Sequence, residues 1–183
     1  MRLNWQMWHR GIDPQTIDKI LSIAAASESQ KAKIFADNKE DNNIRKSEIK
    51  WLSDNHYIRD LLWPFVEQAN RNAFGFDICS VGDIQYTEYS ADNKGHYNWH
   101  HDIDWNDDKA FDRKLSVTVQ LSDPSEYKGG EFQFNETENP QRELLKIKGT
   151  VLVFPSYLSH KVYEVTEGKR KSLVAWFEGP RWK

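Results

Sequence analysis

A histidine and an aspartate separated by a single residue constrain this chain most. They are His100 and Asp102, in the segment Tyr97-Asn98-Trp99-His100-His101-Asp102. In a β-strand, residues two apart project from the same face, so an imidazole and a carboxylate can meet one metal ion from one strand. His160 offers a second imidazole from a distant strand. Two histidines and one carboxylate with open coordination positions are typical of a non-haem Fe(II) oxygenase site.

An H-x-D triplet alone is weak support, but other motifs accompany this one. Arg170 follows His160 by ten residues, Gly129-Gly130-Glu131 lies between the candidate ligands, and the apolar segment 149–156 precedes His160. Arg170 could also be one member of a basic surface run, Lys169-Arg170-Lys171. Its spacing from His160 favours a functional role.

Together these motifs resemble the 2-oxoglutarate and Fe(II)-dependent dioxygenases, in the prolyl 4-hydroxylase-like branch. The resemblance extends over residues 77–179. Its first motif, G-x-Y-x-x-H-x-D, is matched by Gly95, Tyr97, His100 and Asp102. A distal histidine followed ten residues later by a basic residue is matched by His160 and Arg170, and an "LSD…GGE" segment by residues 121–123 and 129–131.

The resemblance implies a double-stranded β-helix, also called a jelly roll or cupin-like fold, with helices outside one sheet. It implies Fe(II), 2-oxoglutarate and O₂ as cofactors and leaves room for ascorbate. His100, Asp102 and His160 would hold the metal. Arg170 would pair with the distal carboxylate of 2-oxoglutarate, for which a bidentate guanidinium is well suited.

Three more residues are assigned to the co-substrate end of the site. Tyr89 matches a family tyrosine that contacts 2-oxoglutarate, and Trp176 matches an aromatic position near the cofactor. Ser172 shares the strand face of Arg170, so we expect it to bond the same carboxylate. If residues 160–165 and 170–175 form a hairpin, Arg170 lies about 16 Å along the strand from His160.

Substrate information is limited to one segment. Arg45 and Ser47, followed by Trp51-Leu52, resemble the "R-x-S" segment beside the peptide groove of prolyl 4-hydroxylases, although a polar loop leading into a helix would look similar. We therefore expect hydroxylation of a prolyl or other peptidyl residue. Hydroxylation of a free amino acid or other small molecule remains an alternative, as does a non-catalytic jelly-roll protein that binds metal or sugar.

Two further classes are disfavoured. A nucleic-acid demethylase would carry a second arginine at position 176, where this chain has tryptophan. A halogenase would lack the carboxylate of Asp102.

Helical spacing predicts two N-terminal helices. The first starts with Asp13 as N-cap and Pro14 in the first turn, and its apolar positions are Ile17, Ile20, Leu21, Ala24 and Ala25. The second has Ile58, Leu61, Leu62, Phe65, Val66 and Ala69 on one face. Pro64 is predicted to kink it or divide it into two short helices. The polar stretch 37–43 between the helices is predicted to be a mobile loop.

After residue 76 the pattern changes to short strands with glycine and proline turns, typical of a sandwich or jelly roll. Residues 115–121 alternate apolar and polar side chains, which predicts a half-buried strand. Residues 151–154 predict a buried strand ending at Pro155. Strands at 162–165 and 173–177 are expected to flank a turn at 166–169.

The length predicts a single domain over residues 1–183, and the strand pattern makes it mainly β. The family resemblance implies that residues 1–76 form helical support and residues 77–183 the double-stranded β-helix core. A net charge of −3 gives no sign of a general polyanion binder. The chain shows neither a membrane-length apolar run nor the apolar core of a signal peptide. A single cysteine, Cys79, excludes an internal disulfide and favours a reducing, cytoplasmic setting. The oligomeric state is left open.

Overall fold

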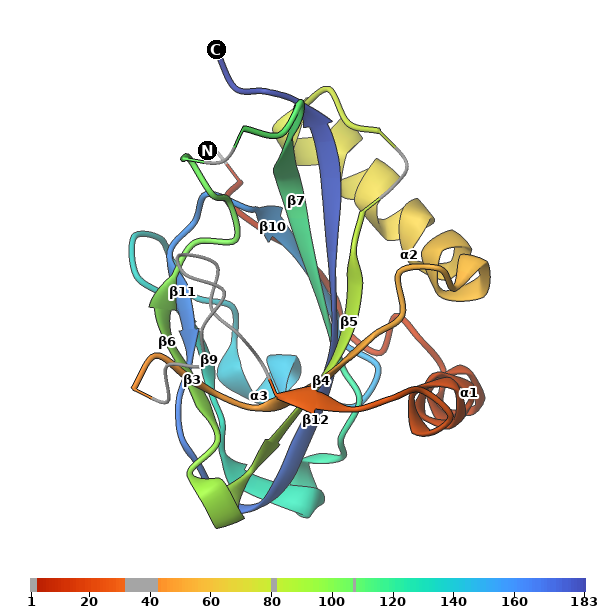
Figure 1. Cartoon of the computed structure of the whole chain (residues 1–183), viewed down its shortest axis with the longest axis vertical. Coiled ribbons are helices and arrows are strands. Elements are labelled where there is room, and N and C mark those ends of the chain that lie inside the picture. Colours follow the sequence, from red (N-terminus) through yellow and green to blue (C-terminus); the bar gives the residue numbers. More distant parts are fainter. Residues whose placement is uncertain (1–2, 32–42, 80–81, 107) are drawn as a thin grey trace.

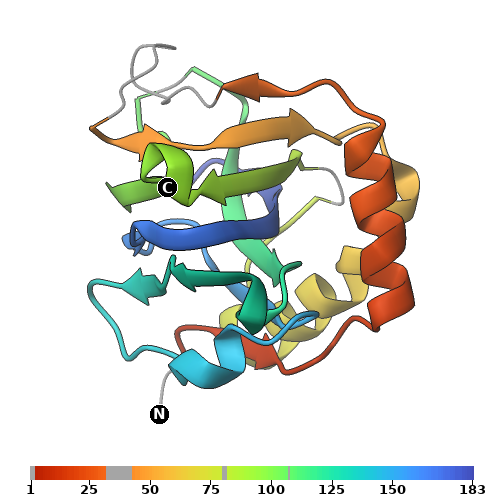
Figure 2. The same ribbon diagram turned by 90° about the horizontal axis from the view of Figure 1, so that it is seen from below.

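The structure is a computed structural model that describes residues 3–31, 43–79, 82–106 and 108–183. Two antiparallel β-sheets face each other, and two helices cover the outer face of the larger sheet (Figure 1). The view from below shows helix α1 beside the larger sheet, with its axis across the strands (Figure 2). This arrangement confirms the predicted mainly β, jelly-roll fold with flanking helices.

The larger sheet has the strand order β1-β10-β7-β12-β5-β4-β2, and β8 pairs with β12 outside this path. Its strands are β1 (Gln6–Trp8), β2 (Gln30–Lys31), β4 (Glu48–Trp51), β5 (Ile84–Ser90), β7 (Phe111–Gln120), β8 (Tyr127–Gly129), β10 (Val151–Pro155) and β12 (Val165–Pro180).

The smaller sheet has the order β3-β6-β11-β9. Its strands are β3 (Arg45–Lys46), β6 (His96–His100), β9 (Phe132–Phe134) and β11 (His160–Val162). The helical elements are α1 (Pro14–Ala25), α2 (His56–Ala69), α3 (Arg142–Leu145), a π-helical segment at Asn70–Phe74, and 3₁₀ turns at Ala91–Asn93 and Pro124–Glu126.

The main hydrophobic core lies between the larger sheet and the two long helices. Ile17 and Ile20 of α1 and Ile58 and Leu62 of α2 pack with the apolar side chains of β7, β10 and β12. The predicted N-cap is confirmed, since Asp13 accepts a hydrogen bond from the backbone N–H of Thr16 at 3.0 Å.

The prediction that α2 divides into two helices is wrong. The helix is continuous from His56 to Ala69 with Pro64 inside it. An internal proline costs a helix about 3 kcal/mol or more. Burial of Ile58, Leu62 and Val66 on one face stabilises the helix through tertiary packing.

The prediction of a half-buried strand at residues 115–121 is also wrong. In β7 every residue from Asp112 to Gln120 is buried. The apolar residues face the helices, and Thr118 on the polar face lines a cavity between the sheets. The sequence alternation was therefore correct, but the polar face meets the cavity and not bulk solvent.

The predicted hairpin around residues 166–169 is wrong as well. Strand β12 runs without interruption from Val165 to Pro180, and its first residues pair with β8. Gly168, with φ +68°, lies so close to the backbone of Glu126 that a Cβ would be 2.0 Å from its oxygen. This glycine allows a close approach between segments. The chain turns earlier, between β11 and β12, and passes from the smaller sheet to the larger.

The N-terminal part is not only helical, because β1, β2 and β4 extend the larger sheet and β3 extends the smaller. Of the predicted mobile loop at 37–43, residues 37–42 lie outside the described residues. Within the described part of the chain, no helix is both long and apolar enough to cross a membrane.

Candidate active site

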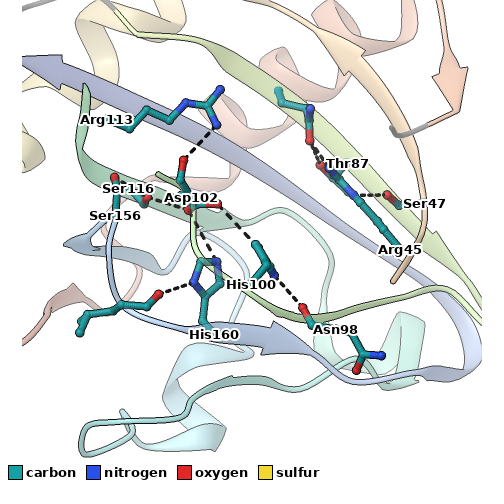
Figure 3. Close-up of polar contacts among 12 residues, drawn as sticks. Arg45, Ser47, Thr87, Asn98, His100, Asp102, Arg113, Ser116, Ser156 and His160 are labelled. Carbon is teal, nitrogen blue, oxygen red and sulfur yellow. Dashed lines mark hydrogen bonds and ion pairs between the residues drawn. The ribbon is translucent and has the colours of Figure 1, made fainter. Parts of the chain in front are cut away.

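Three predicted metal ligands meet at one end of the space between the sheets (Figure 3). One potential ligand atom from each of His100, Asp102 and His160 lies within 4.8 Å of the others. Nε2 of His100 is 3.6 Å from Oδ1 of Asp102, and Nε2 of His160 is 3.6 Å from Oδ2. The two histidines come from adjacent strands, since His160 of β11 is paired with His100 of β6.

The expectation that one strand carries both His100 and Asp102 needs a correction. Strand β6 ends at His100, and Asp102 lies in the bend that follows. Its backbone N–H donates to the carbonyl of Ser156 at 2.9 Å. This hydrogen bond holds the bend against the residue that follows β10 of the larger sheet. His101 between them is exposed, as expected for a residue that is not a ligand.

Backbone carbonyls set the tautomers of both histidines. Nδ1 of His100 lies 2.7 Å from the carbonyl oxygen of Asn98, and Nδ1 of His160 lies 2.9 Å from that of Leu158. A carbonyl can only accept, so each Nδ1 carries the proton and each Nε2 keeps its lone pair for a metal. The Tyr97 ring stacks on the His100 ring at a centroid distance of 3.4 Å and fixes its orientation.

The charge states suit a divalent metal. Burial holds the pKa of His100 well below its ordinary value, so the imidazole is neutral. Burial alone would raise the pKa of Asp102, but His160, His100 and a hydrogen bond from Ser116 outweigh it and lower the pKa. One imidazole nitrogen from each histidine and one carboxylate are a donor set that fits Fe(II).

A cavity extends from these ligands toward the middle of β12. The space between its walls is about 450 Å³, part of which is open solvent. The ligands share the cavity with Arg45, Gln85, Tyr89, Tyr97, Thr118, Phe132, Phe154, Val162, Arg170, Ser172, Val174 and Trp176.

The residues predicted to bind 2-oxoglutarate line this cavity. Arg170 and Ser172 project from the same face of β12, and Tyr89 faces Arg170 across the β5–β12 pair. The Arg170 guanidinium carbon is 5.7 Å from the centroid of the Tyr89 ring. Arg170 is only 5% exposed, so it does not belong to a solvated basic surface run.

Arg170 therefore reaches the cavity from the larger sheet, and His160 reaches it from the smaller. The two residues are not on paired strands of a hairpin. Gly130, from the Gly-Gly-Glu motif, makes room for the arginine, since a Cβ there would lie 2.9 Å from Cδ of Arg170.

Arg45 lines the cavity, whereas Ser47 is not among its lining residues. The Arg45 guanidinium donates to Oγ of Ser47 at 2.9 Å and to Oε1 of Gln85 at 2.7 Å (Figure 3). It also lies over the Tyr97 ring, with its guanidinium carbon 4.5 Å from the ring centroid. Ser47 is thus placed to orient Arg45.

Sequence reasoning missed several residues around the site. Ser116 donates to Asp102, Gln85 holds Arg45, and the buried Arg113 stacks over Trp176 with its guanidinium carbon 3.9 Å from the ring centroid. The alternation of Ser116, Thr118 and Gln120 is the available signal, but alternation alone predicts a solvent-facing side for these residues. Arg113 and Gln85 gave no comparable signal.

A comparison with protein families addresses the identity of this site. Residues 84–178, more than half of the chain, match the family model described as the 2OG-Fe(II) oxygenase superfamily. The chain belongs to this superfamily. Membership implies an oxidoreductase that uses Fe(II), 2-oxoglutarate and O₂, in agreement with the predicted cofactors. Ascorbate stays a prediction.

Curated relatives of this oxygenase include PKHD-type hydroxylases. One from Prochlorococcus marinus is 42% identical over 64 residues, covering 35% of this chain and 28% of the relative. One from Aliarcobacter butzleri is 33% identical over 91 residues, covering 48% of this chain and 40% of the relative. The matched segment thus spans less than half the length of either protein.

Solved structures with the same fold include prolyl hydroxylases. A prolyl-4-hydroxylase from Pseudomonas putida is similar with a TM-score of 0.71 at 17% identity, over 98% of this chain and 94% of that one. A prolyl hydroxylase from Trichoplax adhaerens, in complex with a hypoxia inducible factor peptide fragment, has a TM-score of 0.72 at 16% identity, over 95% and 83% of the two chains. At these identities the likeness supports the fold alone.

Proposed function

We propose that this oxygenase hydroxylates a C–H bond of a prolyl or other peptidyl residue, with Fe(II), O₂ and 2-oxoglutarate. One observation carries the proposal. A two-histidine, one-carboxylate cluster and a buried arginine line the same cavity from opposite sheets. A buried cation must be paired or solvated, and a ligand carboxylate would pair this one.

Residues at the two ends of the cavity would have different roles. His100, Asp102 and His160 would hold the metal, and the carbonyls of Asn98 and Leu158 keep both imidazoles in the ligating tautomer. When bound, Fe(II) supplies the O₂-activating chemistry that couples decarboxylation of 2-oxoglutarate to oxidation of the substrate.

At the other end of the cavity, Arg170 would receive the distal carboxylate, with Tyr89 and Ser172 beside it. The apolar rings of Phe132 and Phe154 pack against His160 at centroid distances of 5.2 and 4.9 Å. They exclude water from the metal ligands on that side, which protects reactive species from side reactions.

A peptidyl substrate is supported by three observations. Several curated relatives are named PKHD-type hydroxylases. Arg45 of the R-x-S segment lines the cavity and is held rigidly by Ser47 and Gln85. Trp176 also lines the cavity, and its buried indole N–H has no hydrogen-bond partner among the described residues. A buried donor without a partner is unusual, and a substrate carbonyl group that reached it would satisfy it.

The test incubates the protein with Fe(II), 2-oxoglutarate and O₂ and screens proline-containing peptides, free amino acids and other small molecules. A peptide that gains the mass of one oxygen atom, with matched consumption of 2-oxoglutarate, is the expected result. Oxygen gain only on a small molecule would instead favour the alternative substrate class. Absence of 2-oxoglutarate consumption with every candidate, despite bound iron, would favour a non-catalytic jelly-roll binding protein.

A further inference from the structure

One buried hydroxyl group contacts the carboxylate of Asp102, a second contacts the first, and the family motifs include neither. Ser116 Oγ lies 2.7 Å from Oδ2 of Asp102 and 2.9 Å from Oγ of Ser156 (Figure 3). Ser116 and Ser156 are both completely buried. No bulk water can therefore replace either hydroxyl at the carboxylate.

The chemistry of the three groups fixes the direction of their hydrogen bonds. An ionised carboxylate only accepts, so Ser116 donates its one hydrogen to Asp102. The oxygen of Ser116 must then accept the hydrogen of Ser156. Hydrogen bonds arranged head to tail in this way polarise and strengthen one another.

Ser156 fixes Asp102 by a second route. Its carbonyl accepts the backbone N–H of Asp102, while its own N–H donates to the carbonyl of Lys114 on β7. Ser116 also belongs to β7. The carboxylate follows the end of β6 in the smaller sheet, yet its orientation is set by β7 and the residue after β10 in the larger sheet.

We propose that Ser116 and Ser156 form a positioning pair for the metal site. Ser116 binds Oδ2 and thereby fixes the rotation of the Asp102 carboxylate toward the two histidines, and Ser156 orients Ser116. The inference rests on the proposed function, because it requires that Asp102 binds a metal. Residues that orient a ligand typically contribute 10–100-fold to metal affinity.

Titration calorimetry of metal-free protein with Mn(II) tests the pair without requiring turnover. Ser116→Ala should weaken Mn(II) binding by about 10–100-fold. Ser156→Ala should weaken it less, and it should add little in the Ser116→Ala background, since Ser156 acts through Ser116. In such a cycle, non-additive losses report coupling between the two residues.

The matched control is Thr150→Val. Thr150 is also completely buried, and its hydroxyl donates to the carbonyl of Leu144 at 2.9 Å, away from the metal ligands. This substitution should reduce thermal stability and leave Mn(II) affinity unchanged. A general loss of stability would therefore be distinguished from a loss of ligand positioning.

Four outcomes would overturn the inference. The first is a Ser116→Ala variant that binds Mn(II) as tightly as the wild type. If Ser116→Ala does not fold, a Ser156→Ala variant with wild-type Mn(II) affinity would overturn the inference instead. Fully additive losses would show that Ser156 does not act through Ser116. Wild-type protein that binds no Mn(II) would overturn both this inference and the proposed metal site. If wild-type protein binds and the variants match it, only the positioning role fails.

Discussion

Arg170→Ala should weaken 2-oxoglutarate binding while leaving metal binding intact. Arg170 is only 5% exposed and its guanidinium lies beside Tyr89, so solvent screens its interaction with a bound carboxylate little. Each hydrogen bond to a charged group contributes about 1.5–3 kcal/mol. A bidentate pair therefore contributes at least about 3 kcal/mol, which corresponds to a loss of affinity of at least about 100-fold.

The assay is calorimetric titration of 2-oxoglutarate into protein saturated with Mn(II), preceded by titration of Mn(II) alone. Lys169→Ala is the matched control, because Lys169 is the neighbouring cation on β12. Its side chain is exposed and pairs with Glu88 at 2.8 Å. This variant should bind 2-oxoglutarate like the wild type. Equal affinity in Arg170→Ala would refute the assignment, and equal losses in both variants would indicate general attraction by the basic run.

Three other predictions follow from the same structure. Asp102→Ala should abolish Mn(II) binding in calorimetry, because it removes the one anionic ligand of the cluster; retained binding would contradict this. Arg45→Gln should slow peptide-coupled turnover and spare the uncoupled decay of 2-oxoglutarate, whereas Lys46→Gln should change neither; equal slowing of both reactions would remove Arg45 from the substrate site. Glu131 has a lowered pKa, because its bonds to Lys146 and Arg142 outweigh burial. It therefore stabilises the fold at neutral pH by less than about 1 kcal/mol, and this contribution is lost as pH falls through its folded pKa. The difference in Tm between wild type and Glu131→Gln should shrink as the pH falls below 4.5, the ordinary pKa of glutamate. A difference that stays constant with pH would refute this prediction.

The sequence by itself determined the chemistry of the site. His100, Asp102, His160 and Arg170 match the motifs of the 2-oxoglutarate dioxygenases in identity and order, and this resemblance indicated a metal bound beside a carboxylate-binding arginine. The helix start at Asp13 was also readable, since an N-cap is a local interaction. The short strands with glycine and proline turns indicated a sandwich or jelly roll, and the family resemblance implied the jelly roll.

Only the tertiary structure decided which polar faces are interior. Alternation in a strand tells which residues share a face, but not whether that face meets solvent or a cavity, because the answer depends on a sheet formed by distant residues. Ser116 and Thr118 were therefore assigned to the wrong environment. Gly168 was read as a turn for the same reason, since its close neighbour Glu126 is invisible in a local pattern.

Burial and pairing between the sheets determined the remaining properties of the site. The sequence placed Arg170 in a basic run, and the β5–β12 pairing brought it inside against Tyr89. The lowered pKa of His100 arises from burial, which no local sequence pattern specifies. The sequence thus supplied the reactive groups, and contacts between distant strands supplied their orientation, protonation and exclusion from water.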